Sequence, residues 1–433
     1  MRDAAVPEHA SAAGRPREVL RLPSFAFFWS ATTIRAFGSA VSGVAFQVLI
    51  VTVLHATPVE ISIFSALGVA PYVFLGLIVG ALMDRWRRQL TLVVTSVGRA
   101  LALASITILL LVNALNFWSL AIVTVVLGVL VLFADSASQP LLPRIVPRDS
   151  LVMANARLGQ SSTVAGTAGP ALGGALLNLL GAPILFLSDA VITGFSAVLQ
   201  SRIRIKEPKP APRTDGRHIG HDIAEGMRYT YRHRMLRPLA LSVHTWFLAN
   251  SIVSTIYAVF VLRELGLPAW AYGVTLAFGA VGGFLGALIA PRIGARLGAG
   301  WGIFVGRALI VVPWLSLAIV PIDAASGIVV LLTLVSAAQF VYGLSMGIED
   351  ANDTGYRQAI APDALQGRMN STIRTVNRVI FLLGALLAGL LATCLGYRLT
   401  IGIGAVIFAA AALIVIVSPL RTARHSDTSE SAA

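Results

Sequence analysis

The chain has 433 residues, of which 56% are hydrophobic and 12% are charged, and its formal net charge is +13. Its mean hydropathy of +0.80 is too high for a soluble domain, so the composition indicates an integral membrane protein. The basic residues fall in the gaps between apolar segments and do not cluster with aromatic residues on a polar one, which argues against nucleic-acid binding. A single cysteine, Cys394, excludes a disulfide framework and a thiolate metal site.

Apolar segments of membrane-spanning length recur along the whole chain. Residues 1–24 have no apolar core of their own, so we expect a cytoplasmic tail and no cleavable signal peptide. At about 20 residues per span, the sequence predicts an all-α membrane protein with twelve transmembrane helices, at residues 25–54, 59–83, 90–112, 118–138, 156–180, 183–201, 238–262, 270–290, 301–320, 327–349, 367–394 and 399–418.

The placement of basic residues predicts the orientation. An even number of spans puts both termini on one side of the membrane. The N-terminal tail, every second joint and the C-terminal tail are rich in arginine, whereas the opposite joints carry Arg263 and Arg398. By the positive-inside rule both termini are cytoplasmic. The heavy use of Arg, Ala and Gly suggests GC-rich bacterial coding, and we therefore expect the bacterial inner membrane.

The longest polar segment between spans divides the chain into two halves. It covers residues 202–237 and predicts a cytoplasmic linker between six-helix halves at 25–201 and 238–418, with a C-terminal tail at 419–433. Within the linker, residues 221–233 could form an amphipathic helix lying on anionic lipid, and a solvated linker is an equal alternative.

The two halves repeat each other in sequence, which indicates duplication. Near the start of each half, residues 80–82 recur as 286–288 and residues 97–101 recur as 305–309. Parallel six-helix repeats place a cavity at their interface near the membrane midplane. At an offset of 215 residues the matching pairs are Asp135 and Asp350, Pro147 and Pro362, Asn155 and Asn370, Gly169 and Gly384, and Gly174 and Gly389.

The joint at residues 80–88, Gly-Ala-Leu-Met-Asp-Arg-Trp-Arg-Arg, resembles the loop between helices two and three of the major facilitator superfamily. Arg87 stands where that family has glycine, and Gln89 where it often has a basic residue. The resemblance implies close helix approach at the glycine and a gating contact between the aspartate and a helix N-terminus. The alternative is a positive loop that only sets topology. The matching residues are Gly80, Leu82, Asp84, Arg85 and Arg88.

Residues 142–155 and 356–370 resemble, more narrowly, the branch of that superfamily with enterobactin exporters and macrolide-efflux proteins. This resemblance implies that Arg144, Arg357 and Arg368 brace a cytoplasmic gate, with topology alone as the alternative. We expect Asp135 and Asp350, near the cytoplasmic ends of their spans, to pair with arginines of the joints and not to bind substrate.

The fifth predicted span contains a run of small residues. Ala165, Gly169 and Gly173 recur every four residues and form a smooth helix face, while Pro170 removes a backbone donor. Together with Gly174, the run resembles the Gly-Pro-x-x-Gly-Gly signature of proton-coupled exporters in this superfamily. It therefore favours export, although glycine-rich packing also occurs in many helical bundles.

Polar residues at helical spacing mark three spans. In the family, helices one, four, seven and ten line the cavity, so these stripes are expected to face it and to suit a large, mostly apolar molecule with scattered polar groups. Ordinary hydrogen bonding between helices is the alternative for each residue. The cavity candidates are Arg35, Ser39, Trp246, Asn250, Tyr257, Gln339 and Tyr342, and Arg35 could recognise an anionic group.

Two acids within the spans, Asp189 and Glu349, are candidates for proton coupling. Ionisable side chains are costly in a bilayer and mark functional positions. Asp189 could serve either as a proton site or as the partner of a buried arginine.

The sequence shows no catalytic constellation, no Walker phosphate loop and no metal motif, so we expect no enzyme activity and no cofactor. Energy must then come from a gradient. We expect a monomeric secondary transporter that exports an amphipathic drug-like or siderophore-like molecule by alternating access and proton antiport. An importer or facilitator of the same fold, or a membrane scaffold or sensor that transports nothing, are the alternatives.

Overall fold

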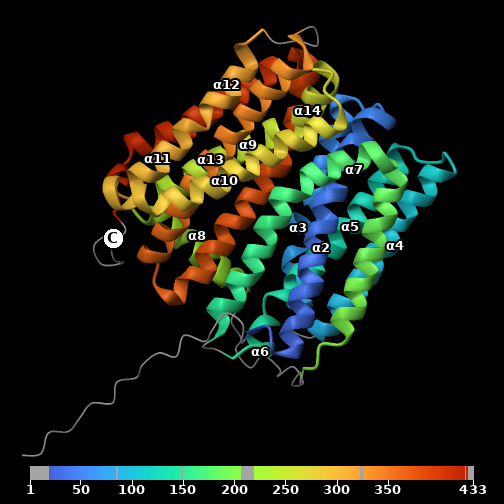
Figure 1. Ribbon diagram of the computed structural model, residues 1–433. Coiled ribbons are helices and arrows are strands. Elements are labelled where there is room, and N and C mark those ends of the chain that lie inside the picture. The colour runs from blue at the N-terminus through green and yellow to red at the C-terminus, as the bar shows by residue number, and fades with distance from the viewer. Residues whose placement is uncertain are drawn as a thin grey trace, which may run out of the picture.

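The computed structural model describes residues 19–83, 86–147, 150–205, 219–321, 326–424 and 426–427, and these ranges are helical with short joints (Figure 1). Ten of the described helices are long and apolar enough to cross a membrane. The N-terminal part comprises α2 (Pro23–Val48), the π-helical η1 (Leu49–Val53), α3 (Pro58–Met83), α4 (Arg88–Leu111), α5 (Phe117–Ser138), the short α6 (Leu142–Ile145) and α7 (Leu151–Ser201).

The C-terminal part continues the same pattern after a short surface helix. Its elements are α8 (Ile219–Arg232), α9 (Leu236–Val259), the π-helical η3 (Phe260–Glu264), α10 (Ala269–Leu297), α11 (Ala299–Leu309), α12 (Val311–Ile319), α13 (Ile328–Ile360), α14 (Asp363–Val417) and η5 (Pro419–Thr422). The predicted amphipathic segment of the linker is thus helical, as α8.

Two glycines reconcile the ten helices with twelve spans. α7 has 51 residues and α14 has 55, each too long for one crossing. Each is broken once by a glycine at positive φ: Gly181 at 78° and Gly396 at 79°. Such a conformation is open to glycine and strained for other residues. Each long helix is therefore two spans joined by a sharp turn, and the described residues supply twelve spans.

Some predicted spans were too short, and one predicted span is interrupted. α13 continues past the predicted end at 349 to Ile360, and α14 begins at Asp363 and not at 367. The predicted span 301–320 is divided at Ile310 into α11 and α12. Pro313 has no N–H to donate to the carbonyl of Leu309, which accounts for a break at this place.

The buried apolar residues show where the halves join. We call the end with residues 86–88, 139–147, 298 and 360–363 the basic end. The opposite end, with residues 54–57, 112–116, Gly181, 265–268 and Gly396, is the far end. One buried cluster at the far end contains residues of both halves, from Val44 to Ala411. At the basic end each half has its own cluster, one from Val19 to Ile203 and one from Leu236 to Ala423.

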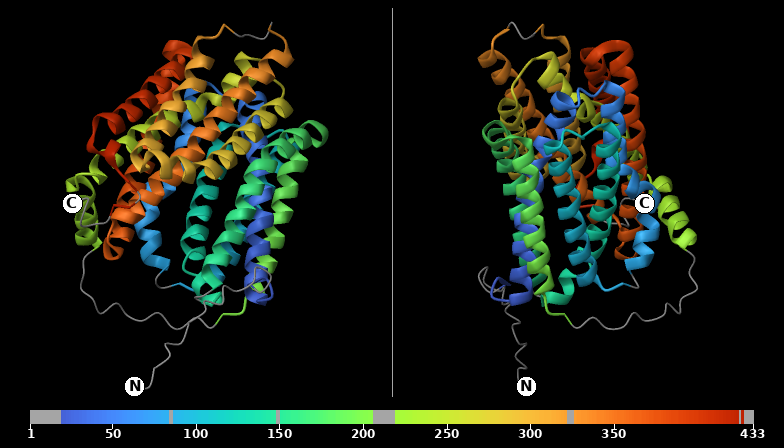
Figure 2. Two further views of the ribbon diagram at one scale, coloured as in Figure 1. Left: turned by 60° about the vertical axis from the view of Figure 1, so that its left-hand side comes forward. Right: turned by 90° about the vertical axis from the view of Figure 1, so that its right-hand side faces the viewer.

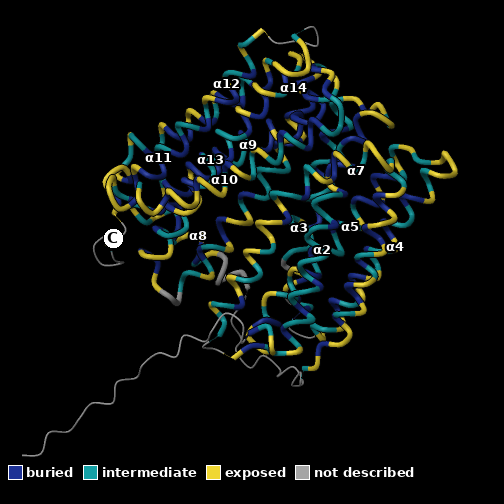
Figure 3. Tube along the Cα trace, viewed as in Figure 1, coloured by how far each residue is buried: buried dark blue, intermediate teal, exposed yellow. Residues whose placement is uncertain are grey.

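The ribbons agree with this division. The two halves lie side by side near the far end and diverge toward the basic end (Figure 2). Exposed residues, drawn in yellow in Figure 3, occur along the outer helices of the bundle. Among the exposed residues are large apolar ones such as Phe74, Leu179 and Val329. Apolar side chains on outer helix faces are the surface that hydrocarbon covers in a membrane protein.

Candidate functional site

The far end is closed by hydrogen bonds between the halves. Arg263, in η3, donates from Nη2 to the carbonyl of Val51 (2.6 Å) and from Nη1 to the carbonyl of Ala56 (2.8 Å). A charged donor on a backbone carbonyl makes a strong hydrogen bond. Arg263 therefore joins the end of the first span to the end of the seventh.

The small-residue run of α7 lies in two packing surfaces at once. A side chain at Gly173 would come within 2.6 Å of the Val41 carbonyl on α2, and one at Gly169 would overlap Ala40. On the other face, a side chain at Gly174 would lie 2.8 Å from the Ala269 carbonyl of α10, and the Pro170 carbonyl contacts Gly273. The predicted exporter-like residues Gly169, Pro170, Gly173 and Gly174 thus hold α7 against its own half and against the other half.

The repeat partner of Gly174 lies in the equivalent contact. A side chain at Gly389 of α14 would come within 2.7 Å of the Pro58 carbonyl of α3 and would overlap Ser62. Both contacts between the halves therefore use a glycine at the same place in each repeat. Close backbone approach of this kind is the usual reason for small residues between membrane helices.

A cavity of about 490 Å³ lies in the C-terminal half toward the basic end. Its walls come from α9, α13 and α14. They combine apolar and aromatic side chains with acids on α13 and arginines on α13 and α14. The main lining residues are Trp246, Met346, Glu349, Asp350, Arg357 and Arg374.

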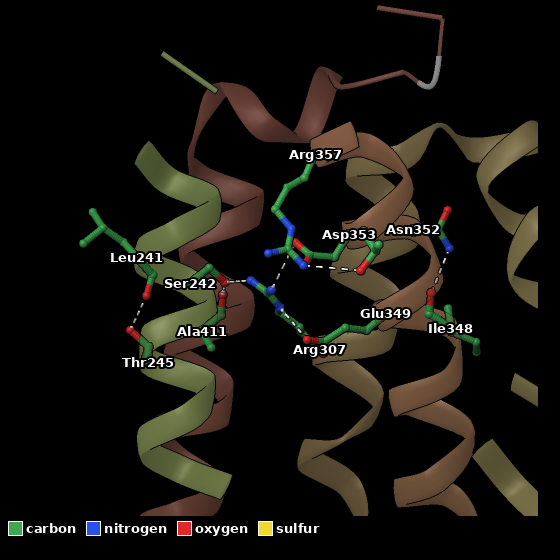
Figure 4. Close-up of polar contacts among 11 residues, drawn as sticks. Leu241, Ser242, Thr245, Arg307, Ile348, Glu349, Asn352, Asp353, Arg357 and Ala411 are labelled. Atoms are coloured by element: carbon green, nitrogen blue, oxygen red, sulfur yellow. Dashed lines mark hydrogen bonds and ion pairs between the residues drawn. The ribbon is translucent and has the colours of Figure 1, made fainter. Parts of the chain in front are cut away.

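A buried arginine organises the charges behind this cavity (Figure 4). Arg307 of α11 has no exposed side-chain surface, and its Nε lies 3.3 Å from Glu349 Oε1. Its Nη1 donates to the Ser242 hydroxyl, and its Nη2 lies 4.0 Å from Asp353 Oδ1. Arg357 holds the other oxygen of Asp353 at 2.7 Å. The network runs from the bundle interior to the cavity wall.

The hydroxyl and amide residues of the predicted C-terminal stripes bond to each other and to neighbouring helices. The Tyr342 hydroxyl donates to Asn250 Oδ1 at 2.7 Å. The Tyr257 hydroxyl donates to Thr275 of α10 at 2.8 Å, and both Tyr257 and Gln339 are buried. Only Trp246 of this predicted set lines the 490 Å³ cavity. Asn250, Tyr257 and Tyr342 thus form hydrogen bonds between helices, which is the alternative considered for each of them.

The first-span stripe likewise points into its own half. Ser39 accepts a hydrogen bond from Arg99 Nη2 of α4 at 3.1 Å, and its place in the central cavity stays a prediction. Ser42 of the same stripe donates to Asp189 in the second part of α7, which packs along α2. Arg35 lies near enough to Arg99 and Asp189 for their charges to interact, and its side chain is half-buried.

Asp189 lies buried among hydroxyl groups. Ser42 donates to Oδ2 at 2.6 Å and Thr193 donates to Oδ1 at 3.2 Å. Gly38 leaves the space for this carboxyl group, because a side chain there would overlap Oδ1. Arg99 is the nearest buried arginine in charge range. Asp189 is thus held by hydroxyl groups within charge range of Arg99, and both the proton site and the arginine partner stay predictions.

A bridge between the halves that sequence reasoning missed centres on Tyr72. The Tyr72 hydroxyl of α3 donates to Asp135 Oδ2 of α5 at 2.7 Å, and the Arg378 guanidinium of α14 lies 3.9 Å from the Tyr72 ring centre. A cation over a ring face at this distance is attracted by the ring quadrupole. Asp135 thus accepts a hydrogen bond from a tyrosine, where we expected a joint arginine. No sequence signal distinguished Tyr72 from other aromatic residues.

The predicted gating residues are spread over the basic end. Asp84 and Arg85 lie outside the described residues. Gly80 is exposed, and no described atom lies within 4 Å of a side chain built there, so the expected close helix approach is absent in this conformation. Arg144 is exposed on α6, and Asp350 is exposed on the cavity wall beside Arg357. Arg88 begins α4, and Arg368 binds Glu225 of α8 at 2.6 Å.

No group of three or more metal-ligating side chains occurs in the part of the chain that the structure describes. The arrangement instead offers a bundle that is closed at one end, an aromatic and charged cavity toward the other, and buried acids held by arginine or hydroxyl partners.

Such a bundle is that of a major facilitator transporter, and the comparisons agree. Residues 16–433 match the family described as transmembrane secretion effectors, MFS_3, and the chain belongs to this family of major facilitator transporters. It is a multi-pass membrane protein of that type. Over 144 residues it is 33% identical to uncharacterised MFS-type transporters of Mycobacterium bovis and Mycobacterium tuberculosis, and the match spans 32% of this chain and 32% of each relative.

Solved structures share the fold at low sequence identity. A bacterial homologue of the human lysosomal transporter Spinster, inward-facing and unoccupied, aligns with a TM-score of 0.72 at 14% identity and covers 91% of this chain and 97% of its own. A bacterial homologue of the iron transporter ferroportin, inward-facing, gives 0.70 at 18% identity, covering 94% and 100%. A mutant of the nucleoside transporter NupG gives 0.71 at 11%, covering 91% and 99%.

Proposed function

We propose that the protein exports an amphipathic small molecule by alternating access, with protons moving inward in exchange. The observation that carries this proposal is Glu349. It is an acid in the wall of the cavity, its side chain is 10% exposed, and it is paired with a buried arginine at 3.3 Å. A proton arriving from the cavity would neutralise Glu349 and remove the charge that holds Arg307.

The consequence of that protonation can be followed through the same network. Arg307 Nη2 lies 4.0 Å from Asp353, so an Arg307 released from Glu349 has a second carboxylate within reach. Asp353 is at present held by Arg357, which lines the cavity. A shift of Arg307 toward Asp353 would weaken the Arg357 contact at the cavity wall. Proton binding and the shape of the cavity are thereby coupled.

Alternating access is supported by the distribution of the buried clusters. The halves share a core at the far end, and each has a separate core at the basic end. With the basic end on the cytoplasmic side of a bacterial inner membrane, as the positive-inside rule predicts, this arrangement faces the cytoplasm. Both termini would then be cytoplasmic, and the six-helix halves would rock about the glycine contacts of α7 and α14.

Export is favoured over import by two observations. The family description names secretion. The exporter-like run Gly169 to Gly174 lies in the contact between the halves, where it can influence their movement. The cavity, with Trp246 and Met346 beside charged groups, suits a drug-like or siderophore-like molecule with an apolar body and polar substituents. The shared fold with a nucleoside transporter keeps an importer or facilitator as the second candidate.

The test begins with an accumulation screen of dyes, antibiotics and siderophores in cells with and without the protein. The compound that is excluded is then studied in proteoliposomes with an imposed pH gradient. In the wild type we expect uphill transport that follows the gradient. Glu349→Gln keeps the size of the side chain and should transport only downhill, without response to pH. Transport that ignores the gradient in the wild type would rule out proton antiport.

The gating assignment has its own test. Asp84→Asn, compared with the wild type at equal protein level, should strongly reduce efflux if the joint between the second and third spans is a gate. Unchanged efflux would refute the gate. A protein that moves no compound in any assay would instead support the scaffold or sensor alternative.

A further inference from the structure

A second pocket lies outside the transport cavity, on the surface helix α8. Its volume is about 510 Å³, and it lies between α8, the joint that follows it and the start of α14 at Leu365. Three of its lining residues are the arginines Arg228, Arg232 and Arg234. The pocket is independent of the residues proposed above for transport.

The helix that carries the pocket is fixed to the bundle. Arg368 of α14 binds Glu225 of α8 at 2.6 Å, and the Tyr231 hydroxyl lies 2.7 Å from His244 Nε2 of α9. Gly226 faces α14 so closely that a side chain there would lie 2.9 Å from the Arg368 carbonyl. α8 therefore presents a fixed outer face and is more than a solvated linker.

The described residues leave the charge of this face without a counter-ion. Arg228, Arg232 and Arg234 are exposed, and their side chains make no ion pair or hydrogen bond with the described residues. The pocket's carboxylate, Glu225, is already bound by Arg368. Within the described part of the chain, the three guanidinium groups around this hollow are therefore not paired with an acid.

A histidine in the same pocket is neutral. His233 Nδ1 accepts the backbone N–H groups of Met235 (3.2 Å) and Leu236 (3.3 Å), so the ring proton is on Nε2. Burial lowers the pKa of His233, which favours this neutral form near pH 7. Nε2 is buried and has no hydrogen-bond partner among the described residues. The lining thus combines three exposed cationic donors with one neutral ring.

We propose that this pocket binds the phosphate headgroup of an anionic phospholipid. Arginine recognises phosphate oxygens through paired N–H groups, and basic pockets at the cytoplasmic face of membrane helices bind anionic headgroups. The apolar side chains of Met227, which is 46% exposed, and Leu365 border the site. α8 lies on the outer flank of the bundle at the basic end, where a headgroup can reach it from the adjacent leaflet (Figure 2). These features favour a lipid over a free phosphate ion.

The experiment counts bound lipid on the full-length protein by native mass spectrometry, with phosphatidylglycerol and phosphatidylcholine added in turn. The wild type should retain phosphatidylglycerol in preference to phosphatidylcholine. The triple variant Arg228→Gln, Arg232→Gln, Arg234→Gln should bind phosphatidylglycerol at least about tenfold more weakly, because each basic residue near the surface contributes to headgroup attraction. The matching triple lysine variant keeps the charge and should retain part of the binding.

The matched control removes three exposed arginines elsewhere at the basic end, Arg21, Arg202 and Arg204. It lowers the charge equally and should bind phosphatidylglycerol as the wild type does. Equal binding by the α8 variant and the wild type, or equal loss in both triple glutamine variants, would overturn the site. Displacement of the lipid by inorganic phosphate at millimolar concentration would show a free-anion site and overturn the lipid assignment. Thermal unfolding of each variant checks that it is folded.

Discussion

Arg99 and Arg307 occupy the same place in the two repeats, yet their surroundings differ. Arg307 has ion-pair contact with Glu349 and lies near Asp353, and it donates to Ser242. In hydrogen bonds the two arginines are alike: Arg99 donates to Ser39, and each guanidinium has two nitrogens without a hydrogen-bond partner among the described residues. The ion pair differs, because Arg99 makes none among the described residues, and Asp189, within its charge range, is held by hydroxyl groups. One copy of the duplicated arginine is locked, and the other is loosely held.

The difference lies in the partner helix and not in the arginine motif. At the 215-residue offset, the positions equivalent to Glu349 and Asp353 are Ala134 and Ser138. The N-terminal half therefore lacks the acids that fix Arg307, and the acids within charge range of Arg99 are Asp189 on α7 and Asp135 on α5. The buried cation is present in both halves, while the acids around it differ. We infer that the C-terminal copy holds the proton-sensitive ion pair.

Replacement of the two arginines should give the largest contrast. Arg307→Met leaves the buried carboxylate of Glu349 without its partner, while Asp353 keeps Arg357, and the change should lower the free energy of unfolding by about 3 to 5 kcal/mol. Arg99→Met removes one hydrogen bond to a hydroxyl and should cost about 1 kcal/mol. Thermal unfolding in detergent measures both. Equal losses would show that the two copies are held alike and would break the comparison.

A second contrast concerns the repeated glycines Gly80 and Gly286. A side chain at Gly286 would overlap the Leu344 carbonyl of α13, so Gly286→Ala should destabilise the protein by about 1 to 3 kcal/mol. Gly80 has free space around it, and Gly80→Ala should be neutral or stabilise the helix by up to about 1 kcal/mol.

Transport measurements can test the role of Gly80 further. If the second and third spans close on the other half during the cycle, Gly80→Leu should keep the wild-type stability and still slow efflux. Normal efflux by Gly80→Leu would mean that the joint stays open throughout, and that the motif resemblance carries no gate in this chain.

Much of the fold could be predicted from the sequence because apolar runs of fixed length are the dominant signal in a membrane protein. The positions of the spans and the repeat came from that signal. The predicted joints at 181–182 and 395–398 contain the turning residues Gly181 and Gly396. That one glycine at positive φ makes each turn could not be predicted, since glycine also serves packing within spans, as Gly173 shows. The continuation of α13 to Ile360 was missed because Glu349, Asp350 and Asp353 were read as the end of the apolar run.

The sequence could predict which buried charged residues belong to the site, but it could not predict their contacts. Buried charges such as Asp189 and Glu349 could be found because they interrupt apolar runs. Their partners lie on other helices, and helix rotation decides which face meets which neighbour. The contact of Ser39 with Arg99 and the contact of Tyr72 with Asp135 were therefore missed, because the spacing of residues along one helix does not indicate either contact.

A third and smaller contrast is between two arginines at the far end. Arg263 bonds across the two halves, and Arg398 bonds within one half. Arg263→Gln removes hydrogen bonds to Val51 and Ala56 and should shift the equilibrium toward opening of the far end by about 1 to 2 kcal/mol. Spin labels at Ala114 and Leu399, in a Cys394→Ser background, should then report a longer distance. Arg398→Gln, which breaks a contact with Glu264 inside one half, is the control and should leave that distance unchanged.

The smallest expected effect separates the two candidate proton sites. Asp189→Asn keeps an oxygen that can accept from Ser42 or Thr193, so its cost in stability should stay below about 1 kcal/mol. The central question is whether transport by this variant still follows a pH gradient. If Glu349 alone carries the proton, Asp189→Asn remains coupled to the gradient and Glu349→Gln does not. If Asp189→Asn loses coupling while Glu349→Gln still responds to the gradient, the proton site is Asp189, near Arg99. The N-terminal half would then carry the proton in place of the C-terminal half.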